Sequence, residues 1–216
     1  MKKSFKKIAA LVSASVMCAV PMLSNYSASA ITQYKTYAVS CKYEKVKGNN
    51  YMAYFDLTLH YNSGLTGEKA IATYLCNGGT FRSTINTASR NIQCTYMGDP
   101  IKTNEYLASA KVIAPMSSDI DNAVYLTSNV VRDINGSALS IDNIVLDNIL
   151  MGDVNEDGKV TKEDADCIIK YLGNQDEYDL TYRQILAADV YNRGDGISGN
   201  DANRIMEYVN GKISHF

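Results

Sequence analysis

Oxygen-bearing side chains recur at alternate positions in the segment DVNEDGKVTKED, residues 153–164. Calcium takes about six to eight oxygen ligands, and a tight EF-hand-like loop supplies them when carboxylates or amides occupy its first, third and fifth positions. Gly158 follows, at the point where such a loop turns sharply. The segment therefore predicts a calcium site with these ligands: Asp153, Asn155, Asp157, the carbonyl of Lys159, Thr161 either directly or through water, and Asp164.

A second, less regular loop, DVYNRGDGISGND, spans residues 189–201. We interpret its Asp195-Gly196 pair as the counterpart of Asp157-Gly158, with extra residues before the pair. Because a longer loop holds its oxygens less rigidly, we expect a second calcium ion that is bound more weakly than the first. The expected ligands are Asp189, Asp195 and Asp201, joined by Asn192 or by a carbonyl near Tyr191.

Each loop needs a rigid element to position it, and the sequence predicts a helix after each. DADCIIKYLGN from Asp164 and DANRIMEYVNG from Asp201 are copies that lie 37 residues apart, which indicates a duplicated unit of one loop and one helix. Residues 180–188 are predicted to form a linking helix. Apolar residues recur at helical spacing in both copies, so we expect the two helices to pack on each other. These residues are Ala165, Ile168, Ile169 and Leu172 in the first copy, and Ala202, Ile205, Met206 and Val209 in the second.

A pair of calcium loops, each followed by one helix, resembles a type I dockerin over about residues 150–216. The resemblance implies two calcium ions and binding to the cohesin domain of a scaffoldin in a cellulosome-like complex. Lys170 and Glu207 differ in charge at equivalent positions of the two helices, which favours one binding orientation. For each predicted contact residue, the alternative interpretation is an exposed residue on a solvated helix face. By the resemblance, the partner contacts are Lys162, Glu163 and Lys170, with Gly199, Asn200 and Glu207.

The chain before residue 149 has the pattern of β-strands. The run YMAYFDLTLHY, residues 51–61, alternates in polarity, and further short runs are rich in Tyr, Val, Ile and Thr. Turn signals such as Asn62-Ser63-Gly64 and Gly98-Asp99-Pro100 separate the runs. The pattern predicts an all-β antiparallel sandwich of jelly-roll or cohesin-like type, followed by a small all-α dockerin domain.

The beginning of the chain has the features of an export signal. Four lysines precede an apolar run at residues 8–23, and small residues occupy positions 28–30. We therefore expect a signal peptide over residues 1–30, a β-sandwich domain over 31–148 and a dockerin domain over 149–216. No later stretch is apolar enough to span a membrane. The expected location is an extracellular or cell-surface multi-enzyme complex.

Acidic residues are concentrated near the C-terminal end. Residues 151–216 hold 13 Asp and Glu against 7 Lys and Arg, whereas residues 31–150 hold 10 of each. Bound cations are the simplest counter-charge for such a short acidic region. No basic surface is left to attract nucleic acid.

Cysteine spacing argues against zinc, because no Cys-x-x-Cys pair or neighbouring histidine occurs after residue 30. An exported chain permits disulfides among Cys41, Cys76 and Cys94. Buried thiols that pack as small apolar groups are the alternative for these residues and for Cys167.

The sandwich admits three functions. FDLTLHYNSGL from Phe55, YLASAKVIAP from Tyr106 and RDINGSALSIDNIVL from Arg132 are faintly similar in order and spacing to strands of cohesins. That similarity implies a small adaptor that receives a dockerin-bearing enzyme and docks onto a larger scaffold.

The second function is a carbohydrate-binding module, which needs aromatic platforms for sugar rings. The chain lacks Trp, and its candidate platforms are Tyr51, Tyr54, Tyr61, Tyr74, Tyr96, Tyr106 and Tyr125. The third is a polysaccharide-degrading enzyme built on paired carboxylates drawn from Asp56, Glu68 and Asp119, or on His60. So small a sandwich with so few acidic residues favours a non-catalytic role, and no catalytic residue is assigned.

Overall fold

The computed structural model describes residues 31–44, 51–68, 70–72, 79–102 and 104–216. The predicted signal peptide, Tyr74 and Cys76 lie outside these residues. Within them, two antiparallel sheets precede a helical region, as predicted. The strands are β1 (Tyr34–Tyr43), β2 (Met52–Tyr61), β3 (Thr66–Gly67), β4 (Ile71–Ala72), β5 (Thr80–Asn86), β6 (Asn91–Ile101), β7 (Glu105–Pro115), β8 (Val124–Asp133) and β9 (Ile144–Leu150), and the helices are α1 (Lys162–Gly173), α2 (Tyr182–Ala188) and α3 (Gly199–Val209).

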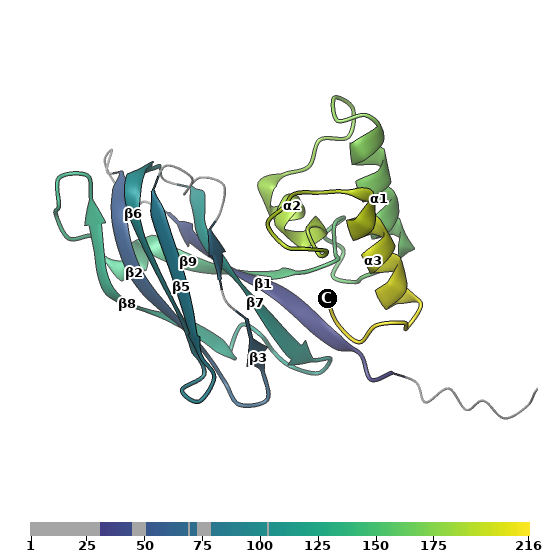
Figure 1. Cartoon of the computed structure of the whole chain (residues 1–216), viewed down its shortest axis with the longest axis horizontal. Helices are drawn as coiled ribbons and strands as arrows, with labels where there is room; N and C mark the ends of the chain where they lie inside the picture. Colours follow the sequence, from purple (N-terminus) through teal and green to yellow (C-terminus); the bar gives the residue numbers. More distant parts are fainter. Residues whose placement is uncertain (1–30, 45–50, 69, 73–78, 103) are drawn as a thin grey trace, which may run out of the picture. The chain divides into compact units, whose positions relative to one another are not determined.

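The two sheets form a sandwich (Figure 1). One sheet has the order β3-β7-β1-β9, with β4 also paired to β7, and the other has the order β5-β6-β2-β8. Alternation explains the packing of β2, where Phe55, Leu57 and Leu59 are buried while Asp56 and Thr58 point to the other face. The sheets enclose a single apolar core between them.

The predicted turn at Gly98-Asp99-Pro100 is wrong, because these residues lie inside β6. The ladder between β6 and β2 shifts register between Met52 and Tyr54, and this irregularity accommodates the Gly-Asp-Pro sequence within a continuous strand. A β-bulge has therefore taken the place of the expected loop.

Strand β1 is buried on both of its faces. Val39 and Cys41 belong to the core of the sandwich, whereas Ala38 belongs to a second core that it shares with Ile168 and Ile205 of the helical region. A strand with one solvated face would alternate between buried and exposed residues, but six consecutive residues of β1 are buried. Residues 31–216 accordingly form one compact unit.

The helices begin and end close to the predicted positions. Helices α1 and α3 contact each other, and Figure 1 shows them side by side. Their contact uses Ala165 and Ile168 of α1, which are buried as predicted. The linking helix is α2, with Thr181 as its N-cap.

Two residues of the predicted apolar face of α1 do not pack inside. The side chain of Ile169 is 56% exposed and that of Leu172 is 39% exposed. Packing against α3 buries only the part of the α1 surface that faces the contact, so the flanking apolar side chains stay in solvent. Within the described residues, no helix has the length and apolar character needed to cross a membrane.

Cys41 and Cys94 are buried and Cys167 is partly exposed. Burial raises the pKa of the Cys41 thiol to about 12. At neutral pH this thiol is therefore protonated and packs as a small apolar side chain, consistent with the second of the two interpretations of the cysteines.

Candidate functional site

The first loop, residues 153–164, connects β9 to α1 and is organised around the Asp164 carboxylate. Asp164 is fully buried. Its Oδ1 accepts hydrogen bonds from the backbone N–H groups of Val154 at 2.8 Å and Asn155 at 3.0 Å. Its Oδ2 accepts from the Thr161 backbone N–H at 2.8 Å and from the Thr161 hydroxyl at 3.2 Å. One side chain thus ties the start of the loop to the first turn of α1.

The loop curls around the Asp153 carboxylate, which is 7% exposed. Asp153 Oδ1 accepts from the backbone N–H of Asp157 at 3.0 Å, and Oδ2 accepts from that of Gly158 at 2.9 Å. Positive φ angles of 63° at Glu156 and 86° at Gly158 direct these N–H groups inward. The Asn155 side-chain oxygen also accepts from the Asp157 N–H, at 3.0 Å. The Asp153 carboxylate and the Asn155 side-chain oxygen therefore lie on the inner side of one turn, next to the Asp157 N–H.

The second loop repeats this arrangement. Asp201 is fully buried, and its Oδ1 accepts from the N–H groups of Val190 at 2.9 Å and Tyr191 at 2.8 Å. Its Oδ2 accepts from the Ser198 N–H at 2.8 Å and hydroxyl at 2.9 Å. Asp189 Oδ2 accepts from the Gly194 N–H at 2.7 Å. Each loop is therefore built on an equivalent pair of buried carboxylates, Asp153 with Asp164 in the first and Asp189 with Asp201 in the second.

The hydrogen bond to Gly194 changes the alignment of the two loops. Gly194 reaches Asp189 over the same five-residue step by which Gly158 reaches Asp153. Gly194, rather than Gly196, is thus the counterpart of Gly158. The extra residue lies after this glycine, where Gly196 adopts a φ of 95°.

Under this alignment Arg193 occupies the fifth position, which Asp157 holds in the first loop. Its guanidinium donates to the Ser109 hydroxyl on β7 at 2.5 Å. Burial lowers the pKa of Arg193 to about 10, while the Asp189 carboxylate opposes that shift. Arg193 therefore contacts the sandwich instead of supplying an oxygen to the loop.

Asn192 lies at the position equivalent to Glu156, with a φ of 49° and an exposed side chain. Its carbonyl accepts from the Asp195 N–H at 3.3 Å, and Asp195 is also exposed. Both residues lie on the turn of the second loop, and the positive φ of Asn192 helps the backbone to turn there. In the first loop, by contrast, the backbone N–H groups of Asn155 and Asp157 donate to the buried carboxylates of Asp164 and Asp153.

Asp189 has an acceptor to spare. Its Oδ1 is buried and receives no hydrogen bond from any described residue. Burial, together with the neighbouring carboxylates of Asp201 and Asp195, raises the pKa of Asp189 to about 6, although the Gly194 N–H and Arg193 oppose the shift. A buried carboxylate oxygen without a donor is stabilised by a cation.

The first loop gathers negative charge in the same way. Burial raises the pKa of Asp153, and the neighbouring carboxylates of Asp164 and Asp157 add to the shift against two backbone N–H groups. Among the described residues, however, no three Asp, Glu, His or Cys side chains converge as a metal cluster. The carboxylates turn toward backbone N–H groups, so a metal ion would also need Asn and carbonyl oxygens. An all-oxygen donor set of this kind fits a hard cation.

The predicted partner-binding residues lie at equivalent places on α1 and α3. Lys162 pairs with Asp166 at 2.5 Å, and the ammonium of exposed Lys170 lies 5.9 Å from the centre of the Tyr178 ring. On α3 the equivalent Glu207 is only partly exposed and pairs with Arg204 at 3.0 Å. Glu163, Gly199 and Asn200 are exposed in the first turns of the two helices.

Ile169 and Leu172 were assigned to the helix core by their spacing, yet they flank Lys170 on the exposed side of α1. Their counterparts on α3 are Met206, which is partly buried, and Val209, which is 38% exposed. The sequence contains a signal for this exposed patch. Four apolar residues recur at helical spacing on α1, but only Ala165 and Ile168 are needed for its buried face. We call Ile169, Lys170 and Leu172 the α1 patch.

Three of the seven candidate platform tyrosines belong to the apolar cores. Tyr61, Tyr96 and Tyr106 are 5%, 1% and 8% exposed. Tyr125, in contrast, is 55% exposed, and its ring stacks on that of His60 with the ring centres 4.6 Å apart. Among the candidates that the structure describes, Tyr125 is therefore the most exposed, whereas Tyr51 and Tyr54 are partly buried.

The carboxylates considered for catalysis each have local partners. Asp56 accepts from the side chains of Gln93 at 2.8 Å and Asn129 at 3.1 Å. Glu68 pairs with Lys111 at 2.8 Å, and Asp119 accepts from the Asn122 side chain at 2.7 Å. His60 Nε2 lies 3.0 Å from the Thr127 hydroxyl. Each group thus takes part in a separate surface contact.

Comparison with known proteins gives a match for the helical region. Residues 151–210 match the family described as the dockerin type I domain. No curated protein matches the chain. Among solved structures, a chain of "R. flavefaciens' third ScaB cohesin in complex with a group 1 dockerin" is 36% identical, with a TM-score of 0.28, and the match covers 30% of this chain and 91% of that chain. The C-terminal region is a type I dockerin, a docking module of a class that generally binds calcium and occurs in extracellular cellulosome complexes.

The buried Asp164 carboxylate provides a test of the loop architecture. Replacing Asp164 by Asn would set an amide N–H₂ group against backbone N–H donors, so we expect the helical region to lose about 2–3 kcal/mol of stability. Asp166→Asn on the same helix removes only an exposed ion pair and should cost less than about 0.5 kcal/mol. Urea unfolding of the whole chain in one buffer measures both, and equal losses would contradict the assignment.

Proposed function

We propose that the chain is a secreted, non-catalytic component of a cellulosome-like assembly that docks, through calcium-dependent folding of its dockerin, onto the cohesin domain of a scaffoldin. The observation that carries the proposal is the repeated unit of one loop and one helix built on Asp153 with Asp164 and on Asp189 with Asp201. This unit coincides with the region that matches the dockerin family.

Calcium would be held in the first loop by Asp153, Asn155, Asp157 and Asp164, with the Lys159 carbonyl and Thr161. The second loop would use Asp189, Asp195 and Asp201 with Asn192 or a backbone carbonyl. The spare Oδ1 of Asp189 supports a cation there, while Arg193 at the fifth position supports weaker binding than in the first loop. Bound calcium would supply the positive charge that lets these carboxylates lie together.

The α1 patch favours one docking orientation. Apolar groups beside the exposed ammonium of Lys170 are the kind of surface that a protein partner can desolvate, and Ile169 is the most exposed apolar side chain of α1. The equivalent end of α3 already contacts the sandwich, because the Tyr208 hydroxyl donates to the carbonyl of Tyr34 on β1 at 2.9 Å. The contact with Lys162, Glu163 and Lys170 would then carry more of the binding energy than that with Gly199, Asn200 and Glu207.

Removing calcium should unfold residues 151–216 and abolish cohesin binding. The reason is that carboxylates held close together repel each other when no cation lies between them, and a small helical core offers little to offset the repulsion. Far-ultraviolet circular dichroism of the whole chain, followed by capture on an immobilised panel of cohesins, measures both effects before and after EDTA. Added excess calcium should restore them; a spectrum unchanged by EDTA would contradict the proposal.

A matched pair of substitutions tests the docking orientation. Ile169→Asp places a charge in the α1 patch and should weaken cohesin binding by about tenfold or more. Val209→Asp is exposed on the other helix and should change the affinity much less. Calorimetric titration of each variant with a cohesin that retains the unchanged chain gives the two dissociation constants. Equal losses of affinity would show that the two helices contribute alike and would contradict a preferred orientation.

The sandwich would act as the cohesin-like receiving module of an adaptor. The outer face of the β3-β7-β1-β9 sheet is covered, since Ala38 and Tyr106 lie in the core shared with the helices. The outer face of the β5-β6-β2-β8 sheet carries the exposed side chains of Met97 and Tyr125. This second face is therefore available for a dockerin-bearing enzyme.

The adaptor role predicts that the chain retains labelled dockerins in a pull-down and that Met97→Glu, in the proposed receiving face, weakens retention by about tenfold. Met116→Glu is a control, because Met116 is exposed but lies just after β7, which belongs to the other sheet. Retention on insoluble cellulose, xylan or starch without capture of any dockerin would instead support a carbohydrate-binding module. Release of reducing sugar would support an enzyme.

A further inference from the structure

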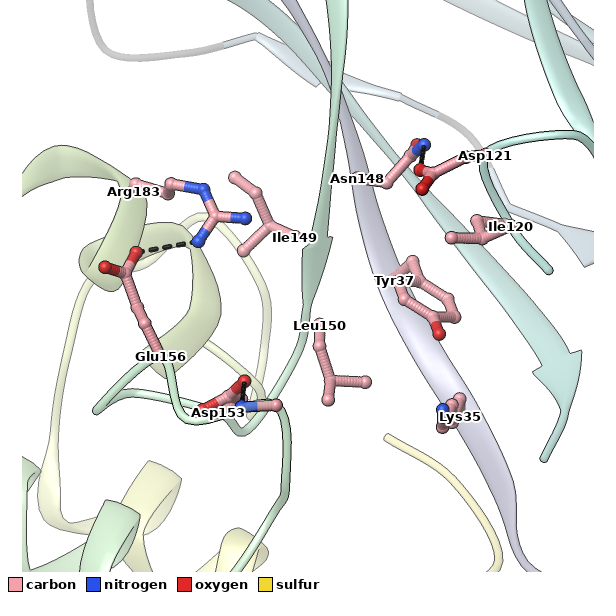
Figure 2. Close-up of a pocket in the computed structure, with 11 residues that line it drawn as sticks. Lys35, Tyr37, Ile120, Asp121, Asn148, Ile149, Leu150, Asp153, Glu156 and Arg183 are labelled. Atoms are coloured by element: carbon pink, nitrogen blue, oxygen red, sulfur yellow. Dashed lines mark hydrogen bonds and ion pairs between the residues drawn. The ribbon is translucent and has the colours of Figure 1, made fainter. Parts of the chain in front are cut away.

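A cavity of about 340 Å³ lies where the first loop meets the β3-β7-β1-β9 sheet (Figure 2). The sheet contributes residues of β1 and β9, and the helical region contributes the first loop and α2. Figure 2 shows Arg183 and Glu156 on one side and Tyr37, Asp121 and Asn148 on the other. The volume is at the small end of the range for ligand sites, about 300–1,000 Å³.

Two planar polar pairs form opposite walls of this cavity. The Asn148 side-chain N–H₂ donates to Asp121 Oδ1 at 2.7 Å. Across the cavity, the Arg183 guanidinium donates to Glu156 Oε1 at 2.7 Å. Each pair fixes its own orientation and leaves further oxygen and N–H positions to hydrogen-bond a ligand.

Asn148 contributes an acceptor that the protein does not satisfy. Its Oδ1 is buried and accepts no hydrogen bond from any described residue. An unpaired buried acceptor costs about 1–3 kcal/mol, and a ligand hydroxyl would relieve this cost if the Asn148 amide turned its oxygen toward the cavity. The hydroxyl group of a small molecule supplies such a donor.

The charges in the cavity oppose one another rather than select an ion. Arg183 is already paired with Glu156 and also with Asp147, at 3.1 Å. The carboxylates of Asp121, Asp153 and Glu156 line the cavity together with Lys35 and Arg183, but within the described chain they do not form a group that could hold a metal ion. Apolar side chains, Ile120 and Leu150, complete the lining. Hydrogen-bonding pairs beside small apolar surfaces suit an uncharged molecule with many hydroxyl groups.

We propose that this cavity binds an uncharged, hydroxyl-rich ligand of one or two sugar rings, such as the end of a polysaccharide chain. Asn148 and Asp121 would bind vicinal hydroxyl groups from one wall, and the Arg183–Glu156 pair would bind them from the other. The ring of Tyr37, which is 7% exposed, forms part of the same wall as Asn148, and its hydroxyl would give the ligand a further hydrogen bond. This site goes beyond cohesin docking and differs from the Tyr125 platform.

The site also depends on the first loop. Asp153 and Gly158 of the loop line the cavity with Glu156, so the wall on that side keeps its shape only while the loop is folded. Sugar binding and docking would therefore share a requirement for calcium while using different surfaces.

Calorimetric titration of the whole chain in calcium with cellobiose, xylobiose and maltose tests the proposal. At least one of the three should bind saturably in the millimolar range. Asn148→Ala and Tyr37→Phe should each weaken that binding by about tenfold, because each removes one hydrogen-bonding group. Tyr125→Ala should leave it unchanged.

Three results would overturn the proposal: no saturable binding of any of the disaccharides, loss of binding in Tyr125→Ala, or unchanged binding in both cavity variants. Thermal unfolding shows whether Asn148→Ala still folds. If it does not, Tyr37→Phe, which keeps the buried ring, tests whether the cavity binds the sugar. Cohesin capture on the same samples separates the two ideas. Capture that persists without sugar binding would remove the sugar site alone.

Discussion

The helical region depends on two buried carboxylates, Asp164 and Asp201, each of which closes a loop onto the first turn of its helix. Burying a carboxylate is costly, and four hydrogen bonds from N–H and hydroxyl donors offset that cost at each of them. The same bonds fix the curvature of each loop and the direction in which its helix leaves. The position of Asp153, Asp189 and every exposed residue on α1 and α3 follows from this closure.

Much of this architecture could be predicted from the sequence, because it is encoded locally. Oxygen-bearing side chains at alternate positions, followed by Gly158, mark the first loop, and helical periodicity marks α1 and α3. The β-sandwich follows from strands with period-two alternation, as in β2. These signals act over a few residues, where chain geometry alone decides the structure.

The features that could not be predicted depend on contacts between distant segments. Periodicity finds an apolar stripe on α1, but only the folded structure shows that Ala165 and Ile168 are buried while Ile169 stays outside. The second loop contains two glycines, and only the hydrogen bond to Asp189 shows that Gly194 matches Gly158. Burial of both faces of β1 likewise requires the helical region to be in place.

Arg193 gives the second loop a role beyond its own fold, since its guanidinium reaches Ser109 on β7. Grafting the docking region onto an unrelated carrier would leave this cation without its hydroxyl acceptor. The sandwich left behind would expose Tyr106 and Ile149, which now lie in the shared core, to water. A transplant that aims to keep both pieces soluble would have to replace Arg193 and cover that apolar surface together.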